Sequence, residues 1–276
     1  MKTIKIILSF IIISLFSISC DDWLDVKPKT QVESSELLKD EAGYKDALWG
    51  VYTLMVQKSM YGLNMTVSLD AMAKIYSRVG TSATQYPLST YSYTSTKAKS
   101  LINDVWQKTY TTIANVNNII GNIQEADPAM FSKDNYNVIY GEALGLRAFL
   151  HFDLLRMFGP IYKDNSTAKR IVYRTEFNRE PKEMQPSNVV VDSIIADLKK
   201  AEMLLKGSDT LKFEFPKTEN EEKRMDVNDA FLVYRHMRMN LYAVKAMLAR
   251  VYLYAGNKTE AANYANQVIE SKHFEL

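Results

Sequence analysis

The chain has 276 residues, 47% hydrophobic and 24% charged, a composition that excludes a disordered or fibrous protein and suits one or two globular domains. The chain has 34 basic and 32 acidic residues. Without Lys2 and Lys5, which lie in the first 19 residues, the basic residues number 32 and the two signs balance. A neutral body argues against nucleic acid as the main partner, because phosphate binding needs clustered positive charge. The single cysteine excludes an intramolecular disulfide and a cysteine metal cluster.

Residues 1–19 have the layout of a signal peptide. Two lysines precede an apolar run, residues 6–18, which is shorter than the roughly 20 residues of a membrane span. Cys20 then opens an acidic stretch, an order that resembles a bacterial lipoprotein signal and implies that Cys20 is the acylated N-terminus of the mature protein. Two or three acyl chains, each contributing roughly 0.8 kcal/mol per buried methylene, would anchor it to a membrane. The alternative is an ordinary secretory signal followed by a spare thiol.

Residues 20–35 are polar and acidic, contain Pro28, and predict a flexible tether. From residue 36 the pattern changes, because apolar side chains recur at steps of three and four residues, as on the buried face of a helix. The residues in this pattern are Leu38, Tyr44, Ala47, Leu48, Val51, Tyr52 and Met55.

Two longer helices are predicted next. Residues 102–123 carry a regular apolar stripe, and residues 135–158 are apolar on more than one face, which predicts a central helix with neighbours on several sides. Gly141 and Gly145 stand one turn apart in this second helix and cost about 0.5–1 kcal/mol each relative to alanine. We expect a neighbouring helix to approach the chain closely there, and we expect the helix to end at Gly159, before a proline.

The C-terminal half predicts a fourth helix over residues 191–205 and a solvated loop in the charged residues 217–229. A helix pair, residues 240–255 and 258–272, follows with the spacing of a tetratricopeptide repeat. No segment has an alternating strand pattern of useful length, so the predicted fold class is all-α. The predicted architecture is a tetratricopeptide-like helical-repeat superhelix with irregular, loop-rich insertions.

One such insertion, residues 61–100, is rich in Tyr, Ser, Thr and Asn. Aromatic faces cover the apolar side of a sugar ring while nearby hydroxyls bind its polar groups, so this composition suits a carbohydrate site. The candidate ligand-binding residues are Tyr76, Tyr86, Tyr91 and Tyr93, with Ser89, Thr90, Ser92 and Thr94 as hydroxyl partners. The alternative is an irregular loop packed on the helices or against another protein.

No catalytic, cofactor or metal motif is present. His151, His236 and His273 are isolated, which favours packing or surface positions, and no pair of carboxylates is set at a fixed spacing by a motif. We therefore expect no enzyme activity, no cofactor and no metal. Arg147 and Arg156 lie in the most apolar helix, where each needs a buried partner such as Glu142 or Asp153.

Several segments, in order, resemble the SusD/RagB family of nutrient-uptake lipoproteins. The block from Glu142 to Pro160 is similar to its motif E-A-x-x-x-R-A-F-x-Y-F-x-L followed by G-x-x-P. The Leu24-Asp25 pair, residues 47–52, the run from Trp106 to Asn115, residues 194–205 and residues 243–256 match further blocks.

This resemblance implies a cell-surface lipoprotein of the outer membrane that captures oligosaccharide and delivers it to a SusC-type TonB-dependent transporter without breaking a bond. The alternative is a tetratricopeptide-type scaffold that binds a peptide or protein; a glycan hydrolase is a third, weaker reading. Family members continue well beyond residue 276, so we expect residues 36–276 to be a SusD-like helical domain that lacks its C-terminal part.

Overall fold

The computed structural model describes residues 34–208, 231–232 and 235–274, in two compact units, residues 1–37 and 38–276. The predicted signal peptide, Cys20, nearly all of the predicted tether and the charged stretch 217–229 lie outside the described residues. In the first unit the described residues form the short helix α2 (Ser34–Leu37), which begins inside the predicted tether. None of the helices in the described ranges combines the length and apolar composition of a membrane span.

The second unit is built from helices, which confirms the all-α prediction. The long ones are α3 (Glu41–Met55), α6 (Thr96–Glu125), α7 (Asn135–Phe158), α8 (Ser187–Leu205), α11 (Leu241–Tyr254) and α12 (Lys258–Glu270). The short ones are the π-helix η2 (Asn64–Ser68), α4 (Leu69–Met72), α5 (Tyr86–Ser89), and the 3₁₀ helices η3 (Pro128–Met130) and η4 (Arg235–Met237).

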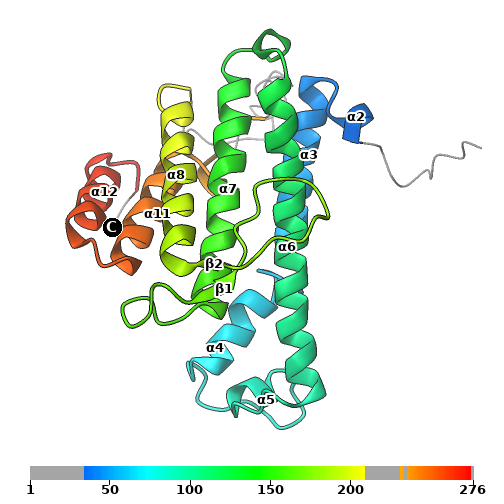
Figure 1. The fold of residues 1–276 in the computed structure, drawn as a ribbon, viewed down its shortest axis with the longest axis vertical. Helices are drawn as coiled ribbons and strands as arrows, with labels where there is room; N and C mark the ends of the chain where they lie inside the picture. Colours follow the sequence, from blue (N-terminus) through cyan, green and yellow to red (C-terminus); the bar gives the residue numbers. More distant parts are fainter. Residues whose placement is uncertain (1–33, 209–230, 233–234, 275–276) are drawn as a thin grey trace, which may run out of the picture. The chain divides into compact units, whose positions relative to one another are not determined.

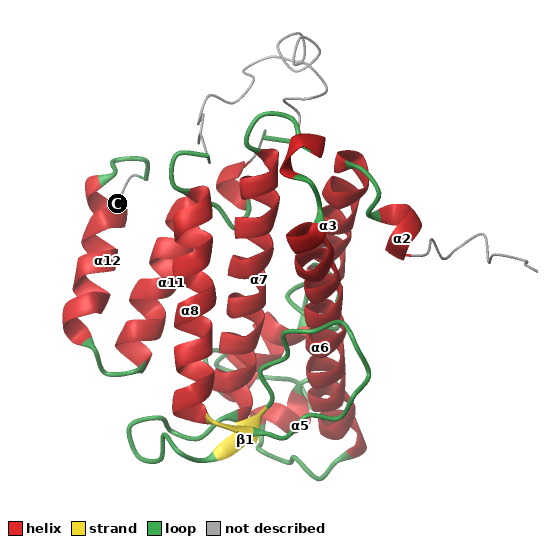
Figure 2. Ribbon diagram, turned by 45° about the horizontal axis from the view of Figure 1, so that its top comes forward, coloured by secondary structure: helices red, strands yellow, loops and turns green. Residues whose placement is uncertain are grey.

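The long helices form a stack in which each lies beside the next, as expected for helical repeats. Figures 1 and 2 show α6 and α3 beside α7, then α8, α11 and α12 in turn, and the tertiary contacts follow the same order. We call these six helices the helical stack. Between α11 and α12 the chain turns at Gly256, whose φ of +83° suits a residue without a side chain.

Helix α7 is the centre of the stack and spans the predicted residues. Its side chains are buried around most of its circumference. Its two glycines sit where other segments come closest: a Cβ on Gly141 would fall 2.8 Å from Leu205 Cγ, and one on Gly145 would fall 2.5 Å from Met239 Cγ. Both glycines therefore serve packing, as predicted.

Of the two arginines of α7, Arg156 has an expected partner and Arg147 does not. Arg147 does not pair with Glu142 or Asp153 but binds Asp197 of α8 with two nitrogens, at 2.6 and 2.7 Å. Residues five or six apart on a helix point in different directions, and this geometry sends Arg147 toward α8 instead. Arg156 does pair with Asp153, at 3.0 Å.

The fully buried carboxylate of Glu142 accepts hydrogen bonds from the guanidinium groups of Arg235 and Arg238 and from the Tyr52 hydroxyl. The two arginines hold the pKa of Glu142 below its ordinary value, although burial acts in the opposite direction. The pairing ties η4 and the residue that follows it to α7.

A small two-stranded antiparallel sheet, β1 (Lys169–Ile171) and β2 (Gln185–Pro186), corrects the expectation of a chain without strands. Each strand is too short to show an alternating pattern. Contacts distant in sequence hold the segment that follows β1: the Val172 amide donates to the Tyr110 hydroxyl at 3.1 Å, and the Arg174 amide donates to His151 Nε2 at 2.9 Å.

Candidate ligand-binding surface

The irregular insertion lies at one end of α6. Residues 61–95, which we call the tyrosine segment, contain η2, α4 and α5 joined by turns, and the segment ends where Ser95 caps α6 by accepting a hydrogen bond from the Ala98 amide at 3.2 Å. Leu88 of α5 packs on Ala98 and Leu101 of α6. The loop-rich insertion predicted from composition is present, with three short helices inside it.

Two of the four candidate tyrosines form an exposed pair. The side chains of Tyr91 and Tyr93 are 53% and 43% exposed, and their ring centroids are 6.3 Å apart with 47° between the planes. Each ring therefore presents apolar surface to solvent at an angle to the other. A pair of rings at this angle can contact the apolar side of a sugar while leaving the rim of the sugar open to hydrogen bonding.

The backbone and a lysine hold Tyr91 in place. Tyr91 adopts a φ of +57°, an uncommon value for a residue with a side chain, and its hydroxyl donates to the Met72 carbonyl at 3.2 Å. The ammonium of Lys74, itself at a φ of +59°, lies 4.9 Å from the centre of the Tyr91 ring and also donates to the Ser89 carbonyl. These contacts restrain the ring before any ligand arrives.

Tyr76, like Tyr91, is hydrogen-bonded to the short helix α4. Its side chain is 40% exposed, and its hydroxyl donates to Asp70 Oδ2 at 3.4 Å, while Tyr91 reaches Met72 two residues further on. Tyr76, Tyr91 and Tyr93 form what we call the tyrosine surface. All three rings are exposed, and their role in ligand binding stays a prediction.

Tyr86 differs from the other candidates, because it is only partly exposed at the start of α5. Its carbonyl accepts hydrogen bonds from the hydroxyls of Ser89, at 2.8 Å, and Thr90, at 3.1 Å. Ser89 is buried, so its hydroxyl serves the turn and is not available to a ligand, contrary to the expectation. Ser92 and Thr94 are exposed as a hydroxyl partner must be.

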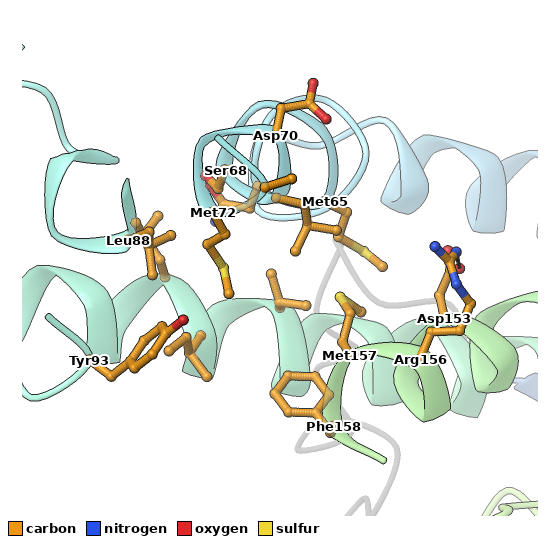
Figure 3. Close-up of a pocket in the computed structure, with 16 residues that line it drawn as sticks. Met65, Ser68, Asp70, Met72, Leu88, Tyr93, Asp153, Arg156, Met157 and Phe158 are labelled. Carbon is orange, nitrogen blue, oxygen red and sulfur yellow. Dashed lines mark hydrogen bonds and ion pairs between the residues drawn. The ribbon is translucent and has the colours of Figure 1, made fainter. Parts of the chain in front are cut away.

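A cleft of about 870 Å³ lies beside the tyrosine surface, between the η2–α4 segment and α6 (Figure 3). We call it the methionine cleft, because Met65, Met72 and Met157 point into it from separate elements. Tyr93 stands at one end and the Asp153–Arg156 pair at the other (Figure 3). No pattern in the sequence predicted this cleft, since methionines in a helix have the same apolar pattern whether they face a core or a cleft.

The charged end of the cleft is held together by partly buried hydrogen bonds. The Tyr61 hydroxyl donates to Asp153 Oδ2 at 2.8 Å, and Arg156 binds the other oxygen. Burial raises the pKa of Asp153, an effect that Tyr61 and Arg156 oppose. The Arg156 side chain stays 48% exposed, so it keeps donors available toward the cleft.

His151 of α7 is fully buried, and both of its ring nitrogens have backbone partners. It contacts the Arg147 carbonyl through Nδ1 and accepts from the Arg174 amide through Nε2, both at 2.9 Å. Burial lowers the pKa of His151 to about 3, which keeps the ring neutral. Across the described ranges, no three His, Cys, Asp or Glu side chains gather as metal ligands would.

Comparison with known families gives a match over most of the chain. A SusD-like family model, described as "Starch-binding associating with outer membrane", matches residues 22–218. SusD-like protein P25 of Formosa agariphila is 24% identical over 210 residues, which are 72% of this chain and 37% of that protein.

Solved structures share the fold. A SusD superfamily protein of Bacteroides thetaiotaomicron aligns with a TM-score of 0.63 at 21% identity, over 86% of this chain and 48% of that one. A SusD-like carbohydrate binding protein of Bacteroides vulgatus aligns with a TM-score of 0.63 at 17% identity, over 86% and 46%. The chain thus spans less than half the length of these relatives, and the agreement confirms the helical-repeat fold.

Proposed function

Because the chain belongs to the SusD-like family, we propose that it binds oligosaccharide at the outer membrane and passes it to a SusC-type TonB-dependent transporter. The family description supports both the location and the class of ligand. The alternative of a peptide-binding repeat scaffold is not favoured by the family match. The binding we propose is non-catalytic and needs no cofactor.

The observation that carries the proposal is the exposed pair Tyr91 and Tyr93, of which Tyr91 is restrained. Buried tyrosines would serve the core, but these rings keep about half of their surface in solvent, while the Met72 carbonyl and Lys74 hold the Tyr91 ring. A ring fixed in its binding orientation loses little conformational freedom when a ligand stacks on it. Such a surface suits weak, reversible capture of a sugar chain.

The link to the membrane is a proposal that rests on Cys20. A diacylated cysteine followed by a tether would keep the helical stack near a transporter while leaving it free to move. Mass spectrometry of the protein from native membranes should find two or three acyl chains on Cys20, and Cys20→Ala should release the protein from the membrane fraction. An unmodified thiol at this position would contradict the anchor.

Titration calorimetry of the full chain against a panel of plant, algal and host oligosaccharides tests the proposed site. We expect Tyr91→Ala and Tyr93→Ala to weaken binding by about tenfold each, as the loss of a stacking ring of ~1–1.5 kcal/mol implies. Phe177→Ala, which removes an aromatic ring that is 56% exposed elsewhere on the surface, is the matched control. Undiminished binding in Tyr76→Ala, Tyr91→Ala and Tyr93→Ala would refute the tyrosine surface.

Two further assays test the rest of the proposal. Purification from native membranes should bring a TonB-dependent transporter with the protein. Incubation with the bound glycan should yield no new reducing ends, and turnover that a single carboxylate substitution abolishes would show an enzyme instead.

A further inference from the structure

The methionine cleft lies next to the tyrosine surface and differs from it in having a largely apolar wall. Its volume of about 870 Å³ is within the usual range for small-molecule sites. Apolar side chains line most of the cleft, namely Met65, Met72, Leu88, Leu101, Ile102, Val105, Met157 and Phe158, while Asn64, Ser68 and Asp70 place polar groups on the η2–α4 wall. A group with a broad apolar face would be buried favourably against the α6 wall, where a hydroxyl-rich ring would lose hydrogen bonds to water. The cleft therefore fits an occupant with an apolar body.

The polar groups of the cleft define the ends of that occupant. The half-exposed guanidinium of Arg156 offers donors at one end, and Tyr93 stands at the other (Figure 3). Asn64, Ser68 and Asp70 add polar side chains along the η2–α4 wall, between the two ends.

Tyr93 belongs to both the cleft and the tyrosine surface, so a single ligand can occupy both. Three methionine side chains and the Phe158 ring favour a flat aromatic body, because methionine sulfur and aromatic edges contact other rings favourably. We propose that the methionine cleft receives an aromatic acyl group, of the hydroxycinnamoyl type, esterified to the glycan that the tyrosine surface holds. Arg156 would bind the phenolic oxygen. The inference rests on the proposed function and specifies its substrate class.

Methyl ferulate, an aromatic acyl ester without a sugar, tests the cleft by itself. Saturation-transfer NMR and titration with the full chain should detect its binding. Ile102→Trp fills the cleft and should weaken binding by about tenfold. Ile75→Trp makes the same change at a residue that is 68% exposed and outside the cleft lining, and should leave binding unchanged. If Ile102→Trp fails to fold, Met72→Gln should weaken binding by about threefold.

The outcomes separate this inference from the proposed function. Tyr91→Ala should weaken glycan binding and spare methyl ferulate, because Tyr91 does not line the cleft. Absence of methyl ferulate binding, or equal binding by Ile102→Trp, would overturn the cleft and leave the glycan site standing. Tighter binding of dodecanoate than of methyl ferulate in the cleft would overturn the aromatic assignment. Methyl ferulate binding without binding of any glycan would refute the proposed function and the sugar-borne acyl group with it.

Discussion

The helical stack and the tyrosine segment are held by different kinds of contact. In the stack, the decisive partners are far apart in the chain and buried, such as Arg147 with Asp197 and Glu142 with Arg238. In the tyrosine segment most hydrogen bonds are local, such as those from Ser89 and Thr90 to the Tyr86 carbonyl. A surface built on local contacts can change its side chains without disturbing the frame that supports it.

The largest expected effect is in the stack. Asp197→Asn leaves the charge of the buried Arg147 without its carboxylate, and we expect the free energy of unfolding to fall by about 3–5 kcal/mol. Urea denaturation followed by circular dichroism measures it. Glu176→Gln, which breaks the exposed pair with Lys182, should cause no measurable change. Equal effects of the two substitutions would show that the buried pair does not support the stack.

The stack should also respond to pH through His151. Its pKa is lowered by burial from 6.5 to about 3, so between these values the unfolded chain binds a proton that the folded chain does not. The free energy of unfolding should therefore fall by up to a few kcal/mol as the pH decreases through this window. His151→Gln should flatten the dependence, measured by urea denaturation at several pH values. An unchanged slope in this variant, or an equal flattening in the exposed His273→Gln control, would exclude His151 as the cause.

A smaller effect distinguishes packed from open positions within the stack. Gly145→Ala places a Cβ 2.5 Å from Met239 Cγ, and we expect a loss of about 1–3 kcal/mol in the free energy of unfolding. Gly121→Ala, on α6 with no atom within 4 Å of the added carbon, should instead stabilise the protein by about 0.5–1 kcal/mol. Thermal denaturation compares them. The same sign of change in both variants would show that α7 has room for a side chain at Gly145.

The smallest expected effect is in the tyrosine segment. Lys74→Met removes the ammonium that lies over Tyr91 and binds the Ser89 carbonyl, and we expect less than about 1 kcal/mol of change in global stability. Hydrogen exchange of the Tyr91 amide, which donates to the Leu88 carbonyl, should nevertheless accelerate. Equal acceleration throughout α7 would mean that the tyrosine segment and the helical stack unfold together, and would contradict their being held by separate contacts.

The helices of the stack are encoded locally in the chain, since a buried face repeats every three to four residues and a residue such as Gly159 marks the end of a helix. Helix α7 has the predicted bounds, and Gly141 and Gly145 mark the predicted close approaches. Composition also indicated the irregular insertion that carries the exposed tyrosines, because a run rich in Tyr, Ser and Thr with weak periodicity lacks a continuous buried face. Ligand binding by these tyrosines stays a prediction.

The packing of the helices and of the segments between them set which groups meet. It paired Arg147 with Asp197, formed the two short strands, buried Ser89 and opened the methionine cleft beside Tyr93. Each of these depends on the direction in which one side chain leaves its helix and on which segment packs opposite it. Periodicity shows which face of a helix is apolar. A contact between distant residues also depends on which face of another segment packs against it, and the pattern of one helix does not contain that information.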